Sequence, residues 1–376
     1  MERKIYLEDI PLDEAWAAFR EALAAAGLWG PLPAETIPLD QALGRVTAGP
    51  VWARLSSPHY HASAMDGYAL RAADTAGASE TRPITLTLVP AGAAALDVGR
   101  PAQAVNTGQP LPAWADAVVM LEHVQSVSDP AGRPAIAIRA GLPPGQHVRP
   151  IGEDMVASEL ILAANQRLRP VDLGALAGAG HAAVSVYRRP RVAILPTGSE
   201  LIPYQQAAAG GVWPGQIVEY NALVLAAQVQ SWGGLASRLP ITPDDPAALE
   251  AALEAAAGGH DLVLANAGSS AGGQDYTADA VASLGALLVH GVAVRPGHPV
   301  ILGLLRPAAG DDAPTPVIGV PGYPVSAALT GEIFVEPLLA RWQGRPAYQP
   351  EQVEAYMTRK VTSHTGDEDY VRMAVG

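Results

Sequence analysis

From Arg191 onward, short apolar runs alternate with segments of helical periodicity, and this alternation constrains the fold more than any other feature of the chain. The run "RVAILPTG" predicts a buried strand, and "EYNALVLAAQVQSWGG" after it predicts a helix. Further strands are predicted at "ASRLPITP", "DLVLANAG", "VILGLL" and "PVIGVPG", and further helices at "DPAALEAALEAAAGG", "DYTADAVASLG" and "SAALTGEIFVEPLLARW". Such alternation predicts a doubly wound α/β domain.

The first half of the chain follows other patterns. Leu12, Trp16, Phe19 and Leu23 recur at helical spacing and predict an amphipathic helix over residues 11–27. A second short helix is expected at "LDQALGR". Farther on, "PITLTLVP" and "AVVMLEHVQSV" each predict one strand, with shorter strands at "PAIAIRA" and "AGHAAVSVYR". After Gly344, "VEAYMTRKVTSHTGDEDYVRMAV" predicts two strands around a turn at Gly366, the start of a further β domain.

Length and charge limit the kinds of protein this chain can be. Its 376 residues, 49% of them hydrophobic, are enough for two to four domains. The net charge of -13 argues against a nucleic-acid or anionic-membrane partner, which would require a basic surface. The absence of cysteine excludes disulfides and zinc–thiolate sites. The N-terminus lacks the apolar core of a signal peptide, and no apolar run approaches the ~20 residues of a membrane span, so we expect a cytoplasmic protein.

Acidic residues follow several predicted strands of the α/β domain. Glu200 follows the first of these strands, Asp244 the second and Asp275 the third. Ligands of open α/β sheets bind beyond the carboxyl ends of the strands, where these residues converge. The third turn, "GSSAGGQD", and the later turn "PGYPVS" add hydroxyls and backbone N–H groups that suit phosphate. Acids alone would repel a phosphate, so the combination predicts a Mg²⁺-assisted site for a phosphorylated ligand.

Structural alternatives remain open for each of these features. A Ser/Gly-rich turn is often only a turn. Asp245 is better suited to cap a helix than to bind a ligand, and Glu200 could do the same. The "GSSAGG" turn is not a P-loop, because no Lys-Ser or Lys-Thr pair follows it.

The first half of the chain carries three further candidate groups. Asp66 lies among small residues in "SPHYHASAMDGYAL", where it could hold its own turn or act on a ligand. Thr107 in "VNTGQPLP" could be a hairpin residue. Asp154 lies in "PPGQHVRPIGEDM", which is also compatible with a local salt-bridged turn. Three histidines are not at metal-ligand spacing, and we expect them to be packed or solvated rather than to bind a metal. They are His59, His61 and His123.

Several of these stretches, in collinear order over nearly the whole chain, resemble one family, the MoeA-type molybdopterin molybdenumtransferases related to the gephyrin E domain. The most specific stretch is "SAMDGYAL". The others are "NTGQPLPAWADAVVMLE", "GQHVRPIGEDM", "ILPTGSEL", "VEYN", "PDDP", "GSSAGGQDYT", "VRPGHPVILG" and "GVPGYPVSA". The resemblance implies that molybdate is inserted into adenylylated molybdopterin with Mg²⁺, that AMP is released, and that molybdenum cofactor forms.

The resemblance also implies a multidomain α/β and β fold. It assigns residues 1–55 and 142–188 to an elongated N-terminal domain and residues 56–141 to a β domain inserted between them. Residues 189–344 would form the molybdopterin-binding-like α/β domain, and residues 345–376 a truncated β-barrel. The implied assembly is a homodimer whose active site is shared between subunits. The molybdopterin adenylyltransferase is a further implied partner.

Matching the motifs position by position gives the site residues that the resemblance implies. The expected catalytic residues are Asp66, Thr107, Asp154, Glu200, Asp244 and Asp275. Of these, Asp244 and Asp275 would also bind the metal. The expected substrate-binding residues are Gly268, Ser269, Ser270, Gly272, Arg295, His298, Pro321, Pro324 and Ser326. An arginine and a hydroxyl suit a tetrahedral oxyanion such as molybdate.

The chain departs from the common family pattern at several positions. Tyr323 replaces the asparagine of "PGNP", His298 replaces a lysine, and Glu219 replaces an aspartate. One alternative is therefore a non-catalytic scaffold or oxyanion sensor with the same fold. A second is the preceding adenylylation step, which relatives of the α/β domain perform alone, but the N-terminal segments and the "SAMDGYA" stretch argue against it.

Overall fold

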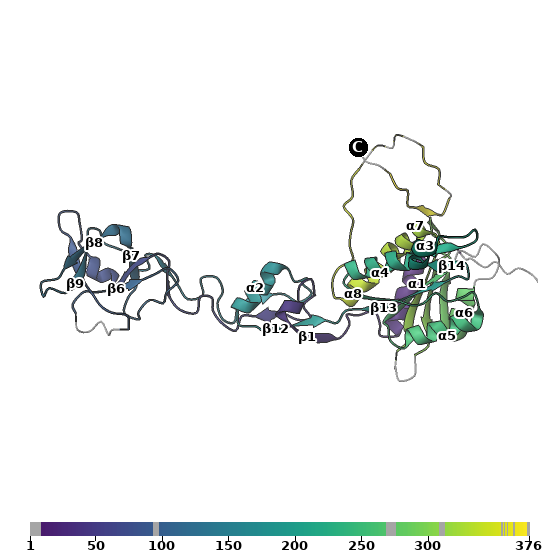
Figure 1. Cartoon of the computed structure of the whole chain (residues 1–376), viewed down its shortest axis with the longest axis horizontal. Coiled ribbons are helices and arrows are strands. Elements are labelled where there is room, and N and C mark those ends of the chain that lie inside the picture. The colour runs from purple at the N-terminus through teal and green to yellow at the C-terminus, as the bar shows by residue number, and fades with distance from the viewer. Residues whose placement is uncertain are drawn as a thin grey trace, which may run out of the picture.

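This computed structural model describes residues 9–92, 98–267, 276–307 and 313–354, together with 356, 358, 360–363 and 365–373. Figure 1 shows three bodies along the long axis of the molecule. A small β body lies at one end, an α/β body lies at the other, and a narrow middle body connects them. Among the described residues, no helix is both long and apolar enough to cross a bilayer.

The α/β body contains a six-stranded sheet in the order β16-β13-β17-β21-β20-β18. The strands are β13 (Arg191–Thr197), β16 (Leu235–Arg238), β17 (Leu262–Ala267), β18 (Gly285–His290), β20 (Ile301–Leu305) and β21 (Thr315–Val320). β13 runs parallel to β16 and β17, and β21 runs parallel to β17, whereas β20 is antiparallel to both of its neighbours. The predicted α/β architecture is therefore confirmed, with a mixed rather than an all-parallel sheet.

Helices cover both faces of this sheet. They are α4 (Asn221–Ser231), α5 (Pro246–Ala257), α6 (Tyr276–Leu284), α7 (Pro324–Thr330) and α8 (Glu336–Trp342). α4 and α8 contribute to one apolar core, whereas α5 and α6 contribute to the other. The predicted closing helix is interrupted, because a π-helical turn, Gly331–Val335, separates α7 from α8. We did not predict β18, which follows α6 without any intervening turn residues.

The first helix, α1 (Leu12–Ala25), packs in the α/β body. Its buried face carries Phe19 and Leu23, which lie in the same apolar core as β13 and β18. The Trp16 ring stacks on Phe334 with ring centroids 5.3 Å apart. We had placed this helix with the elongated N-terminal domain, but its apolar stripe is buried against the α/β sheet instead.

The middle body joins two distant parts of the chain. β1 (Ala34–Pro38) pairs with β12 (Ala183–Tyr187), and β2 (Val51–Trp52) pairs with β11 (Leu160–Leu162). α2 (Pro170–Gly178) packs on this body. These pairings link segments that we assigned to one domain, although the domain boundaries themselves remain predictions.

The helix predicted at "LDQALGR" is wrong. Only Leu39–Gln41 forms a three-residue 3₁₀ turn, in which the Ala42 amide bonds back to the Leu39 carbonyl. Gly44 has a φ of 74°, which is incompatible with a continuing right-handed helix.

The β body contains a six-stranded sheet in the order β7-β4-β6-β5-β9-β8. The strands are β4 (Gly67–Leu70), β5 (Ile84–Leu88), β6 (Pro101–Val105), β7 (Ala117–Met120), β8 (Val124–Ser128) and β9 (Pro134–Ile138). The single strand predicted at "AVVMLEHVQSV" is wrong, because the 3₁₀ turn Leu121–His123 splits it into β7 and β8 at opposite edges of the sheet. A two-stranded ladder, β3 (Ala62–Ser63) with β10 (Val148–Arg149), lies near the link to the middle body.

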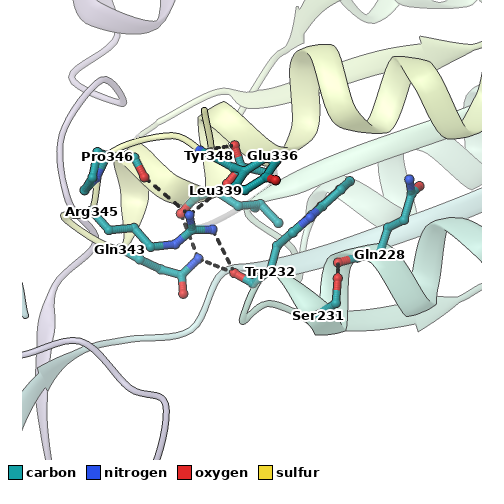
Figure 2. A network of polar contacts seen from close by, with 9 residues as sticks. All are labelled: Gln228, Ser231, Trp232, Glu336, Leu339, Gln343, Arg345, Pro346 and Tyr348. Carbon is teal, nitrogen blue, oxygen red and sulfur yellow. Dashed lines mark hydrogen bonds and ion pairs between the residues drawn. The ribbon is translucent and has the colours of Figure 1, made fainter. Parts of the chain in front are cut away.

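A polar network anchors the segment that follows α8 (Figure 2). Arg345 donates to Glu336 Oε1 at 2.8 Å and to the Trp232 carbonyl at 3.2 Å. Gln343 donates to the same Trp232 carbonyl at 2.8 Å, and the Tyr348 amide donates to Glu336 Oε2 at 3.1 Å. The Glu336 side chain is nearly buried, and the Arg345 guanidinium balances its charge there.

The rest of this segment returns to the α/β body. β22 (Glu368–Asp369) pairs in parallel with β19 (Val294–Arg295). Gly366, where we expected a turn, has a φ of 95°. Among the described residues after 344, β22 is the one strand, so the predicted pair of strands is not found there and the truncated barrel stays a prediction.

Candidate functional site

The turns after β13 and β16 meet at the carboxyl end of the α/β sheet. The Ser199 amide donates to Asp244 Oδ2 at 3.0 Å, and the Asp244 amide donates to Ser199 Oγ at 3.0 Å. A parallel β-bridge between Thr197 and Thr242 joins the two chain segments just before these turns. The reciprocal pair places Asp244 beside the turn that carries Glu200, as the strand order led us to expect.

The neighbouring Asp245 has a different role. Its side chain accepts a hydrogen bond from the Ala248 amide at 2.8 Å, and Pro246 begins α5 directly after it. This is the helix cap that the sequence predicted. The two adjacent carboxylates are therefore distinguished by structure, and Asp244 is the one that faces the other turn.

Several predicted residues lie outside the described part of the chain. They are Gly268, Ser269, Ser270, Gly272 and Asp275. The strand before them ends near Asn266, which is buried and whose Nδ2 donates to the carbonyls of Val320 at 3.3 Å and Pro321 at 3.2 Å. Asn266 therefore ties the end of β17 to the end of β21.

A cavity of about 250 Å³ lies at this edge of the sheet. Its lining combines carboxylates, amides and tyrosines: Glu200, Glu219, Tyr220, Asn221, Asn266 and Tyr323, with Leu201, Ile217, Val218, Gly322 and Pro324. Asn221 Nδ2 donates to the Gly322 carbonyl at 2.7 Å and joins the start of α4 to the turn before α7. The Glu219 carboxylate is occupied, because Oε1 accepts from the Ala222 amide at 2.7 Å.

The residues predicted to bind an oxyanion lie around the start of α7. Ser326 is buried in its first turn, and a Cβ added at Gly297 would lie 3.3 Å from the Ser326 Cβ. The turn that carries Arg295 and His298 therefore packs directly on Ser326. Pro321 and Pro324 flank the same turn before α7.

The Arg295 guanidinium already has an acidic partner. Its Nε donates to Asp367 Oδ2 at 2.5 Å, and this hydrogen bond raises the pKa of Arg295. β22 brings Asp367 to this position by pairing with β19. An oxyanion that binds Arg295 would meet a carboxylate already bonded there.

A second group of predicted residues lies in the β body. Asp66 Oδ1 accepts hydrogen bonds from the Thr107 amide at 2.7 Å and from the Thr107 hydroxyl at 3.0 Å. These two donors, the amide first, hold the pKa of Asp66 below its ordinary value of 3.8. Asp66 thus fixes the "NTG" turn, and its carboxylate remains exposed and ionised near neutral pH.

Asp154 lies in a salt-bridged turn near the link to the middle body. Arg149 donates to Glu153 at 2.6 Å and to both Asp154 carboxylate oxygens at 2.9 and 3.0 Å. These two acids, Glu153 first, raise the pKa of Arg149. Arg149 also lies opposite Ala62 in the β3–β10 ladder, and the Gly108 amide donates to the Ser63 carbonyl. The Asp154 turn, the strand before Asp66 and the Thr107 turn therefore form one cluster.

The two clusters lie in different bodies of the molecule. Asp66, Thr107 and Asp154 lie in or beside the β body, whereas Glu200 and Asp244 lie in the α/β body, with the middle body between them (Figure 1). The chain by itself does not bring the two acidic sets to one pocket.

Sequence reasoning missed three residues that organise the rim. Asn266 interrupts an otherwise apolar strand, and that interruption was a usable signal. Ser199 lies in a quoted motif but received no role. Asp367 gave no local signal, because its contact with Arg295 joins positions far apart in the chain.

Comparisons with known proteins identify the family. Residues 10–180 match the model described as "MoeA N-terminal region (domain I and II)", and residues 193–341 match the model described as "Probable molybdopterin binding domain". The chain is 37% identical over 351 residues to "Molybdopterin molybdenumtransferase 2" of Mycobacterium tuberculosis, covering 90% of this chain and 82% of the relative. It is 35% identical over 317 residues to "Molybdopterin molybdenumtransferase" of a Nostoc species, covering 82% and 70%.

Solved structures agree with this match. The crystal structure of the molybdopterin biosynthesis MoeA protein from Pyrococcus horikoshii OT3 superposes with a TM-score of 0.70 at 30% sequence identity. The match covers 96% of this chain and 86% of that one. Both family regions, their order and the overall fold agree, and the chain therefore belongs to the MoeA-type molybdopterin molybdenumtransferase family.

Proposed function

We propose that this protein is a molybdopterin molybdenumtransferase that inserts molybdate into the dithiolene of adenylylated molybdopterin and releases AMP. The observation that carries the proposal is the rim of the α/β sheet, where Ser199 and Asp244 join two acidic turns beside a cavity lined by Glu200. Relatives that are 37% and 35% identical to this chain over the aligned residues carry the name of this activity.

The proposed catalytic residues are Asp66, Thr107, Asp154, Glu200, Asp244 and Asp275. The proposed substrate-binding residues are Gly268, Ser269, Ser270, Gly272, Arg295, His298, Pro321, Pro324 and Ser326. In this scheme the Arg295 guanidinium and the Ser326 hydroxyl donate to the oxygens of molybdate. Backbone N–H groups of the Gly/Ser-rich residues that follow Ala267 in the sequence would bind the phosphate oxygens.

We propose that Mg²⁺ binds at Asp244 and Asp275. A carboxylate is the type of ligand that Mg²⁺ prefers, and only one oxygen of Asp244 accepts the Ser199 amide, so the residue fits this role. When bound, the ion would offset the repulsion between the acids and the phosphate oxygens. No group of three or more candidate ligands occurs among the described residues, a set that does not include Asp275.

We propose a homodimer in which each active site takes residues from both subunits. The separation of the two acidic clusters within one chain supports this arrangement, because a partner's β body could supply Asp66 to the α/β rim. Exposed apolar side chains near the middle body offer a surface for association, including Trp52, Leu55, Val156 and Leu160. We also propose a cytoplasmic location and an interaction with the molybdopterin adenylyltransferase that supplies the substrate.

A non-catalytic oxyanion-binding scaffold or sensor is the second candidate function. The ion pair between Arg295 and Asp367 favours it, because molybdate would have to displace a carboxylate from the guanidinium. Tyr323 and His298, which differ from the common family residues, lie in the same region.

Release of AMP on addition of molybdate to adenylylated molybdopterin tests the two functions. A transferase releases AMP and forms molybdenum cofactor, whereas a sensor binds molybdate without release. Asp244→Ala is expected to abolish release, and Asp245→Asn, which keeps a helix-capping side chain, is the matched control. If Asp244→Ala releases AMP like the parent, the assignment of the α/β rim is wrong.

A further inference from the structure

Two tyrosines flank the cavity at the α/β rim, and neither ring stacks on another aromatic ring or on a cation among the described residues. Tyr323 is 69% exposed and Tyr220 is 44% exposed, although both line a cavity. Large aromatic side chains are usually more buried than this, because their apolar faces favour removal from water. Exposed aromatic faces beside a cavity suit a planar ligand ring, since stacking of such rings stabilises a complex.

A hydrogen bond joins the two chain segments that carry these tyrosines. Asn221, the residue after Tyr220, donates to the carbonyl of Gly322, the residue before Tyr323, at 2.7 Å. Asn221 is itself buried, and its Oδ1 has no hydrogen-bond partner. Tyr220 precedes α4 and Tyr323 precedes α7, so both rings are carried by the first residues before packed helices rather than by free loops.

The same cavity contains a carboxylate that the described residues leave available. Glu200 is half-buried, and none of the described residues donates a hydrogen bond to its side chain in the structure. A Cβ at Gly198 would lie 2.8 Å from Glu200 Oε2, so glycine at this position makes room for the carboxylate. An ionised carboxylate only accepts hydrogen bonds, and it can accept two side by side.

We propose that this cavity binds the pterin ring of the substrate, with Tyr323 and Tyr220 against its face and Glu200 at its edge. This inference rests on the proposed function and names the part of the substrate that these residues bind. The pyrimidinone half of a pterin has two adjacent donors, the 2-amino group and the neighbouring ring N–H, which match the two oxygens of a carboxylate. The adenine of AMP has an acceptor nitrogen beside its amino group, so the same carboxylate would not match it.

Tyr323 is thereby a specificity-determining residue for the pterin. A side chain without an aromatic face at this position would lose the stacking contact while leaving the Asn221–Gly322 hydrogen bond in place, since that bond uses the backbone of Gly322.

Binding of free pterin, followed by its own fluorescence, tests this inference on the full chain. Tyr323→Ala is expected to weaken binding by about 5- to 100-fold, as for other aromatic stacking contacts. Tyr323→Phe keeps the ring and is expected to bind like the parent. Glu200→Gln is expected to weaken pterin binding as well, because the amide replaces one acceptor with a donor. Trp213→Ala is the matched control, because Trp213 is 70% exposed but does not line the cavity.

AMP serves as the second probe, because it distinguishes binding of an adenine ring from binding of a pterin ring. Unchanged AMP binding by Tyr323→Ala and Glu200→Gln supports the proposal. Loss of AMP binding with unchanged pterin binding would overturn it, as would failure of the parent to bind pterin or an equal loss in Trp213→Ala. Pterin binding that depends on Tyr323 in a protein that releases no AMP would reject the proposed function but keep this inference. Normal AMP release, together with pterin binding that is unchanged in Tyr323→Ala, would overturn this inference but keep the proposed function.

Discussion

The Asp66 carboxylate is ionised more readily than an ordinary aspartate, because Thr107 supplies two hydrogen-bond donors to one of its oxygens. The amide is the larger cause of the lowered pKa, and the hydroxyl is the smaller one. A depressed pKa in the folded protein means that the stabilisation by this contact is present above the unfolded-state pKa. It is lost as the pH falls through the folded-state pKa.

Thr107→Val is expected to raise the pKa of Asp66 part of the way back to 3.8, because valine removes the hydroxyl donor and keeps the amide. The pH window in which Asp66 stabilises the fold becomes narrower in consequence. A carboxyl NMR titration of Asp66 measures the shift. Thr107→Ser keeps the hydroxyl and serves as the control. An unchanged pKa in Thr107→Val would show that the hydroxyl does not act on Asp66.

Asp129 is a structural counterpart to Asp66 in the same body. It accepts hydrogen bonds from the Arg133 amide at 2.9 Å, from Arg133 Nε at 2.7 Å and from the Thr87 hydroxyl at 3.0 Å. These donors, the Arg133 amide first, lower the pKa of Asp129 to about 2. The carboxylate holds the turn between β8 and β9.

Asp129→Asn is expected to lower the midpoint of thermal unfolding at neutral pH, because the amide cannot accept the same set of donors. The difference from the parent should shrink as the pH falls from 3.8 towards about 2, since the parent then loses its carboxylate too. Thermal unfolding followed by circular dichroism across this range measures both effects. A difference that stays constant with pH would show that the ionised carboxylate is not the stabilising species.

Among the elements, those governed by local signals were predictable from sequence. α5 has its capping aspartate and first-turn proline, and α1 has an uninterrupted apolar stripe. β18 was missed because no turn residue separates it from α6, and the break between β7 and β8 was missed because strand-forming residues continue through it. Packing partners are set by contacts far apart in the chain, which explains why the packing of α1 against the α/β sheet was not predicted.

The residues of the candidate site also divide into those that the sequence predicts and those that depend on contacts between distant parts of the chain. The acids of the α/β rim were predictable because parallel strands deliver their carboxyl ends to one edge. Asp367 beside Arg295 was not predictable, since it depends on the path of the chain after α8. The Arg345–Glu336 ion pair at the start of this path was not predictable either. It joins the first residue of α8, which follows the π-helical turn, to the segment after α8.

Phe19→Ala is expected to destabilise the α/β body by about 3–5 kcal/mol, because Phe19 is fully buried in the core between α1 and the sheet. The midpoint of the α/β unfolding transition in urea measures this loss. Val171→Ala in α2 is the control, since Val171 is exposed and should change stability by less than about 0.5 kcal/mol. Equal midpoints for Phe19→Ala and the parent would mean that α1 does not stabilise the α/β body.

At the scale of the whole molecule, the elongated shape separates the two acidic clusters. The β body and the α/β body lie at opposite ends in Figure 1, and the described residues form no contact between Asp66 and the α/β rim. The proposed site that uses both clusters would therefore take Asp66 from a second subunit, and this proposal can be tested by mixing variant subunits.

Asp66→Ala and Asp244→Ala proteins, each inactive as a homodimer, are expected to regain activity when their subunits are mixed. A mixed dimer has one site with both parent residues and one site with both substitutions. Random exchange of subunits then leaves about a quarter of all sites intact. AMP release from the exchanged mixture, compared with each protein alone, measures the recovery.

A mixture of Asp244→Ala with Glu200→Ala is the matched control, because both residues lie on the α/β rim of one chain. Every site in that mixture keeps one defect, so no activity should return. Recovery in the first mixture but not in the control assigns Asp66 to the partner's site. Failure of the first mixture, with subunit exchange verified by mass, would mean that Asp66 and Asp244 do not act in a site shared between subunits. The distance between them in one chain would then leave Asp66 with the role of holding the Thr107 turn.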